Sequence, residues 1–247
     1  MPAQDRPSER RSAARTGVVW AALRGSLEDG AGSGGRVRIV DIGGGTGGFA
    51  VRLAALGHEV TVVDPSPDAL AALSRRAAES GVTDLVEAVQ GDLAGLPGLV
   101  EDVDVVLCHG VLEVVDDPAA ALAAIRGVLR PGGILSLLVA QRHAAVVARA
   151  MAGHFGQARA LLDGSEPESR AGHRFTHDEI VARVQAAGFA IDAVHGVRVF
   201  ADLVPGALLD AEPGAAHALV ELEAAVAELP AYFPLAAQLH LLARSPR

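Results

Sequence analysis

A short apolar stretch that runs directly into a cluster of glycines constrains the fold of this chain more than any other feature. Residues 37–42 read Val-Arg-Ile-Val-Asp-Ile, and residues 43–48 read Gly-Gly-Gly-Thr-Gly-Gly. The apolar run is typical of a buried parallel strand, and a helix-like stretch follows the glycines at once. Glycine lacks a Cβ, so the backbone can turn sharply and approach a ligand closely. Because the next helix presents free N–H groups at its start, the sequence predicts a nucleotide-type cofactor site here.

The glycine spacing alone fits two kinds of cofactor. Gly43, Gly45 and Gly48 satisfy G-x-G-x-x-G, and Asp64 follows about 20 residues later, as a dinucleotide-binding fingerprint requires. Asp41 precedes the first glycine by two positions and completes Asp-Ile-Gly-Gly-Gly-Thr-Gly. That segment resembles motif I of the class I S-adenosylmethionine (SAM) methyltransferases. A tight turn without any ligand is disfavoured, because such a turn needs only one glycine.

Length and composition narrow the class of protein. At 247 residues the chain can bury a sizeable core, which favours one α/β domain with insertions. Half of the residues are apolar, but no run reaches the ~20 residues of a membrane helix, so we expect a cytoplasmic protein without a membrane partner. The single cysteine, Cys108, and the scattered histidines predict no metal site. The net charge of -9 argues against general affinity for nucleic acid, although a local basic surface is compatible with it.

Strands and helices alternate from residue 37 onward, which predicts a parallel sheet covered by helices on both faces. A capping box of Thr176 and Glu179 predicts the start of a late helix that ends near Ala187. The expected strands are 37–42, 59–63, 86–90, 103–108, 134–139, 189–200 and 235–243. The expected helices are 14–27, 48–56, 66–80, 118–129, one or two within 142–164, the capped helix, and 215–228.

Polar residues follow four of the predicted strands, at the edge where parallel sheets bind ligands. The first are those of the glycine loop itself. Asp64, before Pro65, is placed to accept hydrogen bonds from both ribose hydroxyls, or to serve as the N-terminal charge of a helix. Asp92 follows Gly91 at the third strand end. His109 ends the fourth strand, and its ordinary pKa suits base chemistry near neutral pH, although a lone histidine is also commonly a hydrogen-bonded structural residue.

Five further segments resemble successive blocks of the bacterial tRNA 5-carboxymethoxyuridine methyltransferase family. They keep their order over nearly the whole chain and read CHGVLEVVDDP, GVLRPGGILSLLVA, MAGHFGQA, GVRVF and ALVELE. The resemblance implies a Rossmann-like α/β fold with a seven-stranded, mostly parallel, doubly wound sheet and helical insertions after strands 5 and 6. It also implies an enzyme that uses SAM to methylate the carboxylate of a modified wobble uridine.

The resemblance also implies roles for parts of the chain. We expect residues 1–36 to form a mobile arm up to residue 14, a helix and a glycine-rich linker at 30–35. Residues 37–247 would form the methyltransferase domain, with 142–175 and 201–234 as lid or substrate-side insertions. SAM's methionine part would lie over Gly43 and Gly44, and Asp92 would hold its adenine. Arg15 would pair with the SAM carboxylate, or would be a solvated helix charge. The implied SAM-binding residues are Arg15, Asp41, Gly43, Gly44, Gly45, Asp64, Pro65, Gly91, Asp92 and His109.

The methyl acceptor is either tRNA or an acidic small molecule. A carboxylate is already ionised near neutral pH and needs a cation to hold it. Arg198 is the candidate for that cation, or is equally a surface charge near a strand end. A hydroxyl acceptor would instead need His109 as a base. Residues 163–168 are acidic and aromatic residues make up only 3% of the chain, whereas single-stranded bases are usually held by aromatic side chains and a positive groove. The basic residues that could serve either acceptor are Arg142, His143, Arg170, His173, Arg174 and Arg198.

Two other classes of function compete with a methyltransferase. An NAD-dependent oxidoreductase has the support of the glycine spacing alone, and the chain lacks an evident substrate-domain pattern. A protein that keeps the fold only to bind a partner is disfavoured by the intact glycine loop, Asp64 and Asp92. Saturable affinity for SAM without affinity for NAD separates the first two classes.

Overall fold

The computed structural model describes residues 7–30, 35–164, 172–211 and 213–246. The chain divides into two compact units. The first comprises Met1–Ser26, Ala140–Ile180 and Ala193–His240, and the second comprises Leu27–Val139, Val181–Asp192 and Leu241–Arg247. The glycine loop belongs to the second unit, whereas most of the inserted helices belong to the first.

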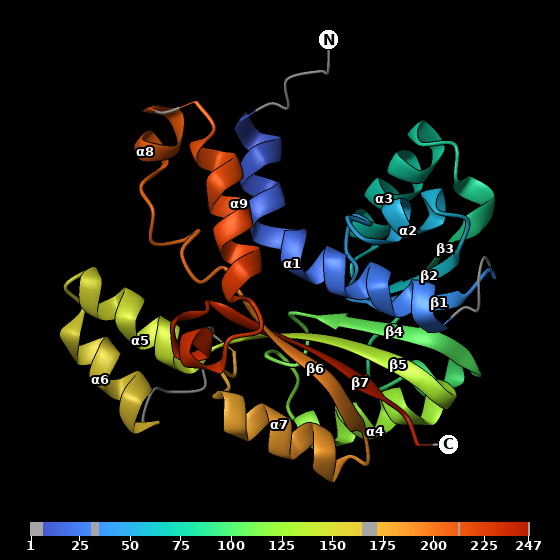
Figure 1. The fold of residues 1–247 in the computed structure, drawn as a ribbon. Helices are drawn as coiled ribbons and strands as arrows, with labels where there is room; N and C mark the ends of the chain where they lie inside the picture. The colour runs from blue at the N-terminus through green and yellow to red at the C-terminus, as the bar shows by residue number, and fades with distance from the viewer. Residues whose placement is uncertain (1–6, 31–34, 165–171, 212, 247) are drawn as a thin grey trace. The chain divides into compact units, whose positions relative to one another are not determined.

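The second unit is built on five parallel strands (Figure 1). β1 pairs with β2 on one side and with β4 on the other, so the glycine loop leaves the middle of the sheet. Ile39, Ile42 and Leu107 are almost completely buried and explain why the apolar runs form central strands. The strands are β1 (Arg38–Ile42), β2 (Glu59–Asp64), β3 (Val86–Gln90), β4 (Val103–His109) and β5 (Leu129–Ala140).

Side-chain caps start two helices of the second unit. Ser66 accepts a hydrogen bond from the N–H of Ala69 at the start of α3 (Pro67–Glu79). Asp117 accepts from the N–H groups of Ala119 and Ala120 at the start of α4 (Pro118–Val128). α2 (Ala50–Ala55) begins two residues later than predicted, because the glycines continue as turns as far as Phe49. α2 and α3 pack against β2 and β3. Short 3-10 helices at Thr83–Leu85 and Leu96–Gly98 were not predicted.

Two late strands complete a seven-stranded sheet with the order β3-β2-β1-β4-β5-β7-β6. They are β6 (Ala190–Val197) and β7 (Gln238–Arg244). Ser245, beyond the end of β7, donates to Gly133 near the start of β5, and Gln141, beyond the end of β5, donates to Ala237 just before β7. β7 therefore runs antiparallel to β5, and the predicted fold class is confirmed.

The first unit contains the inserted helices. α5 (Arg142–Met151) and α6 (Phe155–Asp163) pack against each other, and so do α8 (Gly206–Ala211) and α9 (Ala215–Val226) (Figure 1). α7 (His177–Ala186) follows the predicted capping box. A 3-10 helix, Pro230–Leu235, precedes β7. No helix in the described ranges has both the length and the apolar character needed to cross a bilayer.

The helix predicted for residues 14–27 begins earlier than expected, because α1 spans Pro7–Gly30 and so takes in residues 7–13 of the predicted arm. Pro7 is a favourable first helical residue, and the following Glu, Arg and Ala residues are good helix formers. Residues 1–6 of the arm and residues 31–34 of the linker lie outside the described ranges. β6 is also shorter than the predicted strand, because the chain turns at Arg198.

Candidate functional site

The glycine loop packs so closely on its neighbours that a side chain at Gly44 would not fit. A Cβ on Gly44 would lie 2.5 Å from an Oδ2 of Asp41, far inside contact distance. Gly43 adopts a φ of +65°, and its N–H donates to the carbonyl of Val63 at 2.8 Å. The loop is thus both tightly turned and tied to β2, with a bare backbone that a ligand can approach closely.

Asp41 is the buried acid at the end of β1. Only 3% of its surface is exposed. Burial, with a smaller effect from the nearby charge of Asp64, raises the pKa of Asp41 to about 7. A carboxylate with this pKa gains from a cationic group brought next to it, because the positive charge offsets the cost of burying the ionised form.

Asp64 links the glycine loop to the start of α3. Its Oδ2 accepts from the N–H of Gly45 at 2.9 Å, and its Oδ1 accepts from the N–H of Ser66 at 2.8 Å. Pro65, which lies between Asp64 and Ser66 in the sequence, is exposed. The carboxylate therefore serves the start of the helix and also ties the glycine loop to it, while its role toward a ribose stays a prediction.

Gly91 and Asp92 follow β3, the neighbour of β2. The N–H of Gly91 donates to the carbonyl of Asp64 at 3.3 Å, and a Cβ on Gly91 would lie 2.6 Å from Cδ1 of Leu99. Asp92 is exposed, and its Oδ1 accepts from the N–H of Gly95 at 2.9 Å. Asp92 thus shapes its own loop through one oxygen, whatever else it binds.

His109 ends β4 in a setting that changes its predicted chemistry. Its Nε2 lies 2.9 Å from Oγ of Ser136 on β5, and its ring packs edge-on against Phe49 at 4.9 Å between centroids. Burial lowers the pKa of His109 to about 4. The expectation of an ordinary pKa is therefore wrong, and the imidazole is neutral and weakly basic at pH 7.

The structure brings nine of the predicted site residues together in the second unit, at the carboxyl ends of β1 to β4. Arg15 and Arg198 belong to the first unit. Arg15 lies within α1, and its side chain falls outside the described part of the chain. Arg198 follows β6, and its Nη2 lies 3.3 Å from Oδ2 of Asp202. The nine residues are Asp41, Gly43, Gly44, Gly45, Asp64, Pro65, Gly91, Asp92 and His109.

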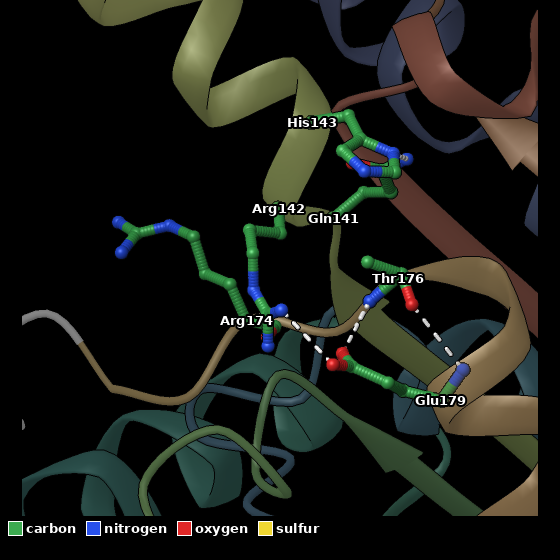
Figure 2. Close-up of polar contacts among 6 residues, drawn as sticks. All are labelled: Gln141, Arg142, His143, Arg174, Thr176 and Glu179. Carbon is green, nitrogen blue, oxygen red and sulfur yellow. Dashed lines mark hydrogen bonds and ion pairs between the residues drawn. The ribbon is translucent and has the colours of Figure 1, made fainter. Parts of the chain in front are cut away.

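Arg142, one of the predicted basic residues, already forms contacts with other residues of the protein (Figure 2). Its Nη1 lies 2.9 Å from Oε1 of Glu179, and its Nη2 donates to the carbonyl of Arg174 at 3.1 Å. Glu179 in turn closes the predicted capping box, because its Oε2 accepts from the N–H of Thr176 at 2.9 Å. Burial by itself would raise the pKa of Glu179, but the N–H of Thr176 and the charge of Arg142 hold it below its ordinary value.

The remaining basic candidates do not form one converging group. In Figure 2 the side chains of His143 and Arg174 point away from each other. Nδ1 of His143 lies 3.5 Å from Nε2 of the buried Gln141, and the ring of His173 lies beside Phe175 at 6.2 Å. Arg170 lies outside the described residues. A role for these basic residues toward an acceptor stays a prediction.

A cavity of about 430 Å³ in the first unit is lined by none of the predicted site residues whose side chains the structure describes. Val18 and Ala22 of α1 and Val220 of α9 form part of its apolar wall, and His195 and Glu223 supply polar atoms. The described lining includes no arginine or lysine, so it offers an anionic acceptor no cationic partner. No group of three or more potential metal ligands occurs within the described ranges.

Glu223 is the functional candidate that sequence reasoning missed. It is 1% exposed, and both of its carboxylate oxygens accept backbone hydrogen bonds from the segment after β6. A signal was present, because Glu223 occupies the same helical face as the buried Leu219 and Val226. A charged residue on such an apolar face indicates a buried polar partner.

Comparisons with known proteins agree with this arrangement. A family described as a methyltransferase domain matches residues 40–137. The chain is 30% identical over 215 residues, 86% of this chain and 81% of the other, to the tRNA 5-carboxymethoxyuridine methyltransferase of Escherichia coli K12. It is 32% identical over 166 residues, 65% of each chain, to the ubiquinone biosynthesis O-methyltransferase of Xanthomonas euvesicatoria. The magnesium protoporphyrin IX methyltransferase of Synechocystis, solved with bound SAH, superposes with a TM-score of 0.64 at 15% identity and covers 99% of this chain and 89% of that one.

Proposed function

Because the chain belongs to the class I SAM-dependent methyltransferases, we propose that it forms a methyl ester on a carboxylate, namely that of 5-carboxymethoxyuridine in tRNA. SAM is the methyl donor, which decides between the two cofactors that the glycine spacing allowed. When bound, SAM supplies a methyl group on a sulfonium, which is open to in-line attack by an acceptor oxygen. The protein's own task is then to position the acceptor and to exclude the wrong ones.

The observation that carries the proposal is the setting of His109, whose Nε2 lies 2.9 Å from Oγ of Ser136 and whose pKa is lowered by burial. A hydroxyl acceptor must lose a proton during transfer. A base whose pKa is near the pH of the working solution removes that proton best. The pKa of His109 is about 4, far from that range. A carboxylate, by contrast, is already ionised near neutral pH and asks for no base. This favours a carboxylate acceptor. His109 would then hold the end of β4 in place by packing and hydrogen bonding.

The choice of tRNA as the carrier of that carboxylate draws on the breadth of the similarity. The match to the tRNA 5-carboxymethoxyuridine methyltransferase spans 86% of the chain, whereas the match to the ubiquinone O-methyltransferase spans 65%. The wider match reaches into the insertions that follow the common domain at residues 40–137. Function is carried by sites and loops grafted on a shared fold, so similarity in the insertions bears on the acceptor more than similarity in the common domain does.

We assign SAM to the glycine loop, with its amino group near Asp41, its ribose at Asp64 and its adenine near Asp92. The residues present fit this cofactor. Only glycine at position 44 lets the loop lie directly against the buried Asp41, where a Cβ would clash, and that buried acid gains from a cation. In this arrangement the backbone and the three acids hold the cofactor, while His109 and Ser136 keep the end of β4 in place.

The affinity for SAM should fall as the pH drops below about 7. Asp41 has a pKa of about 7 in the free protein, and an ammonium beside it favours the ionised form. Below that pH, binding must first remove a proton, so the affinity should decline by up to about tenfold per pH unit. Titration calorimetry in two buffers of different ionisation enthalpy should find proton release at pH 6 and little at pH 8.

Two variants bracket this pH dependence. Asp41→Asn should remove it, since no carboxyl remains to be ionised. Asp68→Asn, an exposed acid in the first turn of α3, should leave it intact. An equal pH dependence in the wild type and in Asp41→Asn would refute the placement of the amino group.

Replacing His109 by Asn should reduce turnover on a carboxylate acceptor by no more than about threefold, because no proton transfer is lost. A hydroxyl methyltransferase would instead lose about 100-fold or more. Initial rates at saturating SAM give the comparison, with the thermal midpoint of each protein as a check on folding. A 100-fold loss on a proven carboxylate acceptor, in a folded variant, would contradict the role assigned to His109.

A small acidic molecule is the second candidate acceptor, and the charge of the chain favours it. The net charge is -9, and residues 163–168 include three acids. Nucleic-acid binding normally draws on phosphate neutralisation by basic side chains. In both cases the methyl group is transferred to a carboxylate. The two candidates differ only in the molecule that carries this carboxylate, a tRNA or a small acid.

The test uses methyl-labelled SAM with two acceptor pools. One pool is bacterial tRNA that contains unmethylated 5-carboxymethoxyuridine, and the other is a mixture of small carboxylic acids. We expect label on the tRNA that mild alkali releases, because methyl esters hydrolyse easily. Alkali-stable label would contradict ester formation, and alkali-labile label on the small acids alone would move the assignment to the second candidate.

A further inference from the structure

We propose that the buried Glu223 positions Arg198 to bind a carboxylate through its Nε–Nη2 edge. The inference rests on the proposed function in one respect, because it takes the bound carboxylate to be that of the methyl acceptor. The site lies at the turn that follows β6 in the first unit.

Glu223 holds the backbone of that turn. Its Oε2 accepts from the N–H of Val199 at 2.9 Å, and its Oε1 accepts from those of Phe200 and Ala201 at 2.8 and 2.7 Å. A carboxylate that is 1% exposed is costly unless its oxygens are hydrogen-bonded, and here three N–H groups in a row meet that need. The segment directly after Arg198 therefore has little freedom to move.

Arg198 itself has a strained backbone. Its φ is +58°, a left-handed conformation that non-glycine residues adopt rarely. Its carbonyl accepts from the N–H of Ala237 at 3.3 Å, while the next three residues are held by Glu223. Strain of this kind persists only where the surroundings over-determine it, and it gathers at sites that bind ligands.

Apolar packing also fixes the turn that follows β6. Val199 is fully buried in a cluster with Val226 and Ala236, and Phe200 packs on that cluster. The ring of Phe200 also meets Tyr232 at 6.0 Å between centroids, edge to face. The direction in which the side chain of Arg198 leaves the backbone is thus set by this apolar cluster as well as by Glu223.

The side chain of Arg198 has an incompletely used edge. Its Nε is buried and has no hydrogen-bond acceptor within the described part of the chain. Its Nη2 lies 3.3 Å from Oδ2 of Asp202, and the side chain as a whole is 26% exposed. The Nε and Nη2 donors of a guanidinium form the parallel pair that a carboxylate accepts in a bidentate fashion. A ligand carboxylate would satisfy the buried Nε and take the place of Asp202 at Nη2.

The experiment titrates methoxyacetate, which has the same –O–CH2–COO⁻ group as the proposed acceptor, into the full-length protein. Nitrogen-15 NMR follows the arginine Nε–H signals, and Arg198→Lys identifies the signal of interest because lysine has none. Methyl methoxyacetate, the neutral ester, and sodium chloride at equal ionic strength are the ligand controls. The readout needs neither SAM nor methyl transfer, so its failure is distinguishable from a failure of the proposed function.

We expect a saturable shift of the Arg198 signal with methoxyacetate and none with the ester. Glu223→Gln should weaken that binding by about tenfold or more, because its amide places an N–H₂ against the N–H of Val199. Glu221→Gln is the matched control, since Glu221 is an exposed acid on the same helix, and it should bind as the wild type does. No shift in the wild type would overturn the carboxylate site, and unchanged binding in a folded Glu223→Gln would overturn the positioning role.

A second variant keeps the test informative if Glu223→Gln fails to fold. Asp202→Asn removes the carboxylate that meets Nη2, and Asp202 is partly exposed. Methoxyacetate should then bind several-fold more tightly, since it no longer competes with a charged neighbour. Equal or weaker binding in Asp202→Asn would contradict the proposed exchange at Nη2.

Discussion

Replacing Gly44 by alanine should abolish measurable binding of SAM. The added Cβ would lie 2.5 Å from Oδ2 and 2.6 Å from Cγ of Asp41, and 3.0 Å from Cγ1 of Val62. Asp41 is buried and cannot swing into water, so the loop itself must move. A displacement of about 1 Å at a site of this kind costs about 100-fold in function, and we expect at least that loss in SAM affinity by calorimetry.

Gly48→Ala is the control for this prediction. A Cβ at Gly48 meets nothing within 4 Å, and Gly48 does not have a left-handed φ. Its SAM affinity and thermal midpoint should match those of the wild type. If Gly44→Ala bound SAM as tightly as Gly48→Ala does, the glycine loop would not be where the cofactor approaches the backbone.

Asp64→Asn should weaken SAM binding by about 10- to 100-fold. Hydrogen bonds to charged groups contribute about 1.5–3 kcal/mol, which corresponds to that range of affinity. Asparagine keeps one acceptor oxygen, but its N–H₂ must face the N–H of either Gly45 or Ser66, which now bond to the two oxygens of Asp64. The variant therefore disturbs the glycine loop and the ribose contact together.

Asp68→Asn tests whether this effect is specific. Asp68 lies in the first turn of α3 and is exposed, so its removal takes away a negative charge near the same helix start. It should change SAM affinity by less than about twofold, as expected for a surface charge. Equal losses in Asp64→Asn and Asp68→Asn would mean that the helix-start charge, and not the ribose contact, is what Asp64 provides.

The strand-and-helix order was readable from the sequence because local signals and burial agree there. β1 is an apolar run that ends in glycines. Ser66 caps α3, and Asp117 caps α4. The capping box of Thr176 and Glu179 starts α7. Each signal acts over a few residues, so it survives without knowledge of the tertiary structure.

The chemistry of the site was less readable because it depends on contacts between distant residues. The pKa of His109 is set by its burial, which sequence spacing does not reveal. Arg142 looked available for a ligand until Glu179, 37 residues away, proved to hold it. Glu223 and Arg198 are 25 positions apart, and their relation emerges only when α9 meets the turn after β6.

The most direct test of the proposed ester formation identifies the methylated nucleoside itself. Wild-type protein is incubated with SAM and tRNA that contains unmethylated 5-carboxymethoxyuridine, and the tRNA is digested to nucleosides for mass spectrometry. We expect this nucleoside to gain one methyl group and mild alkali to convert it back to the free acid. A methyl group on any other nucleoside, or one that resists alkali, would contradict it.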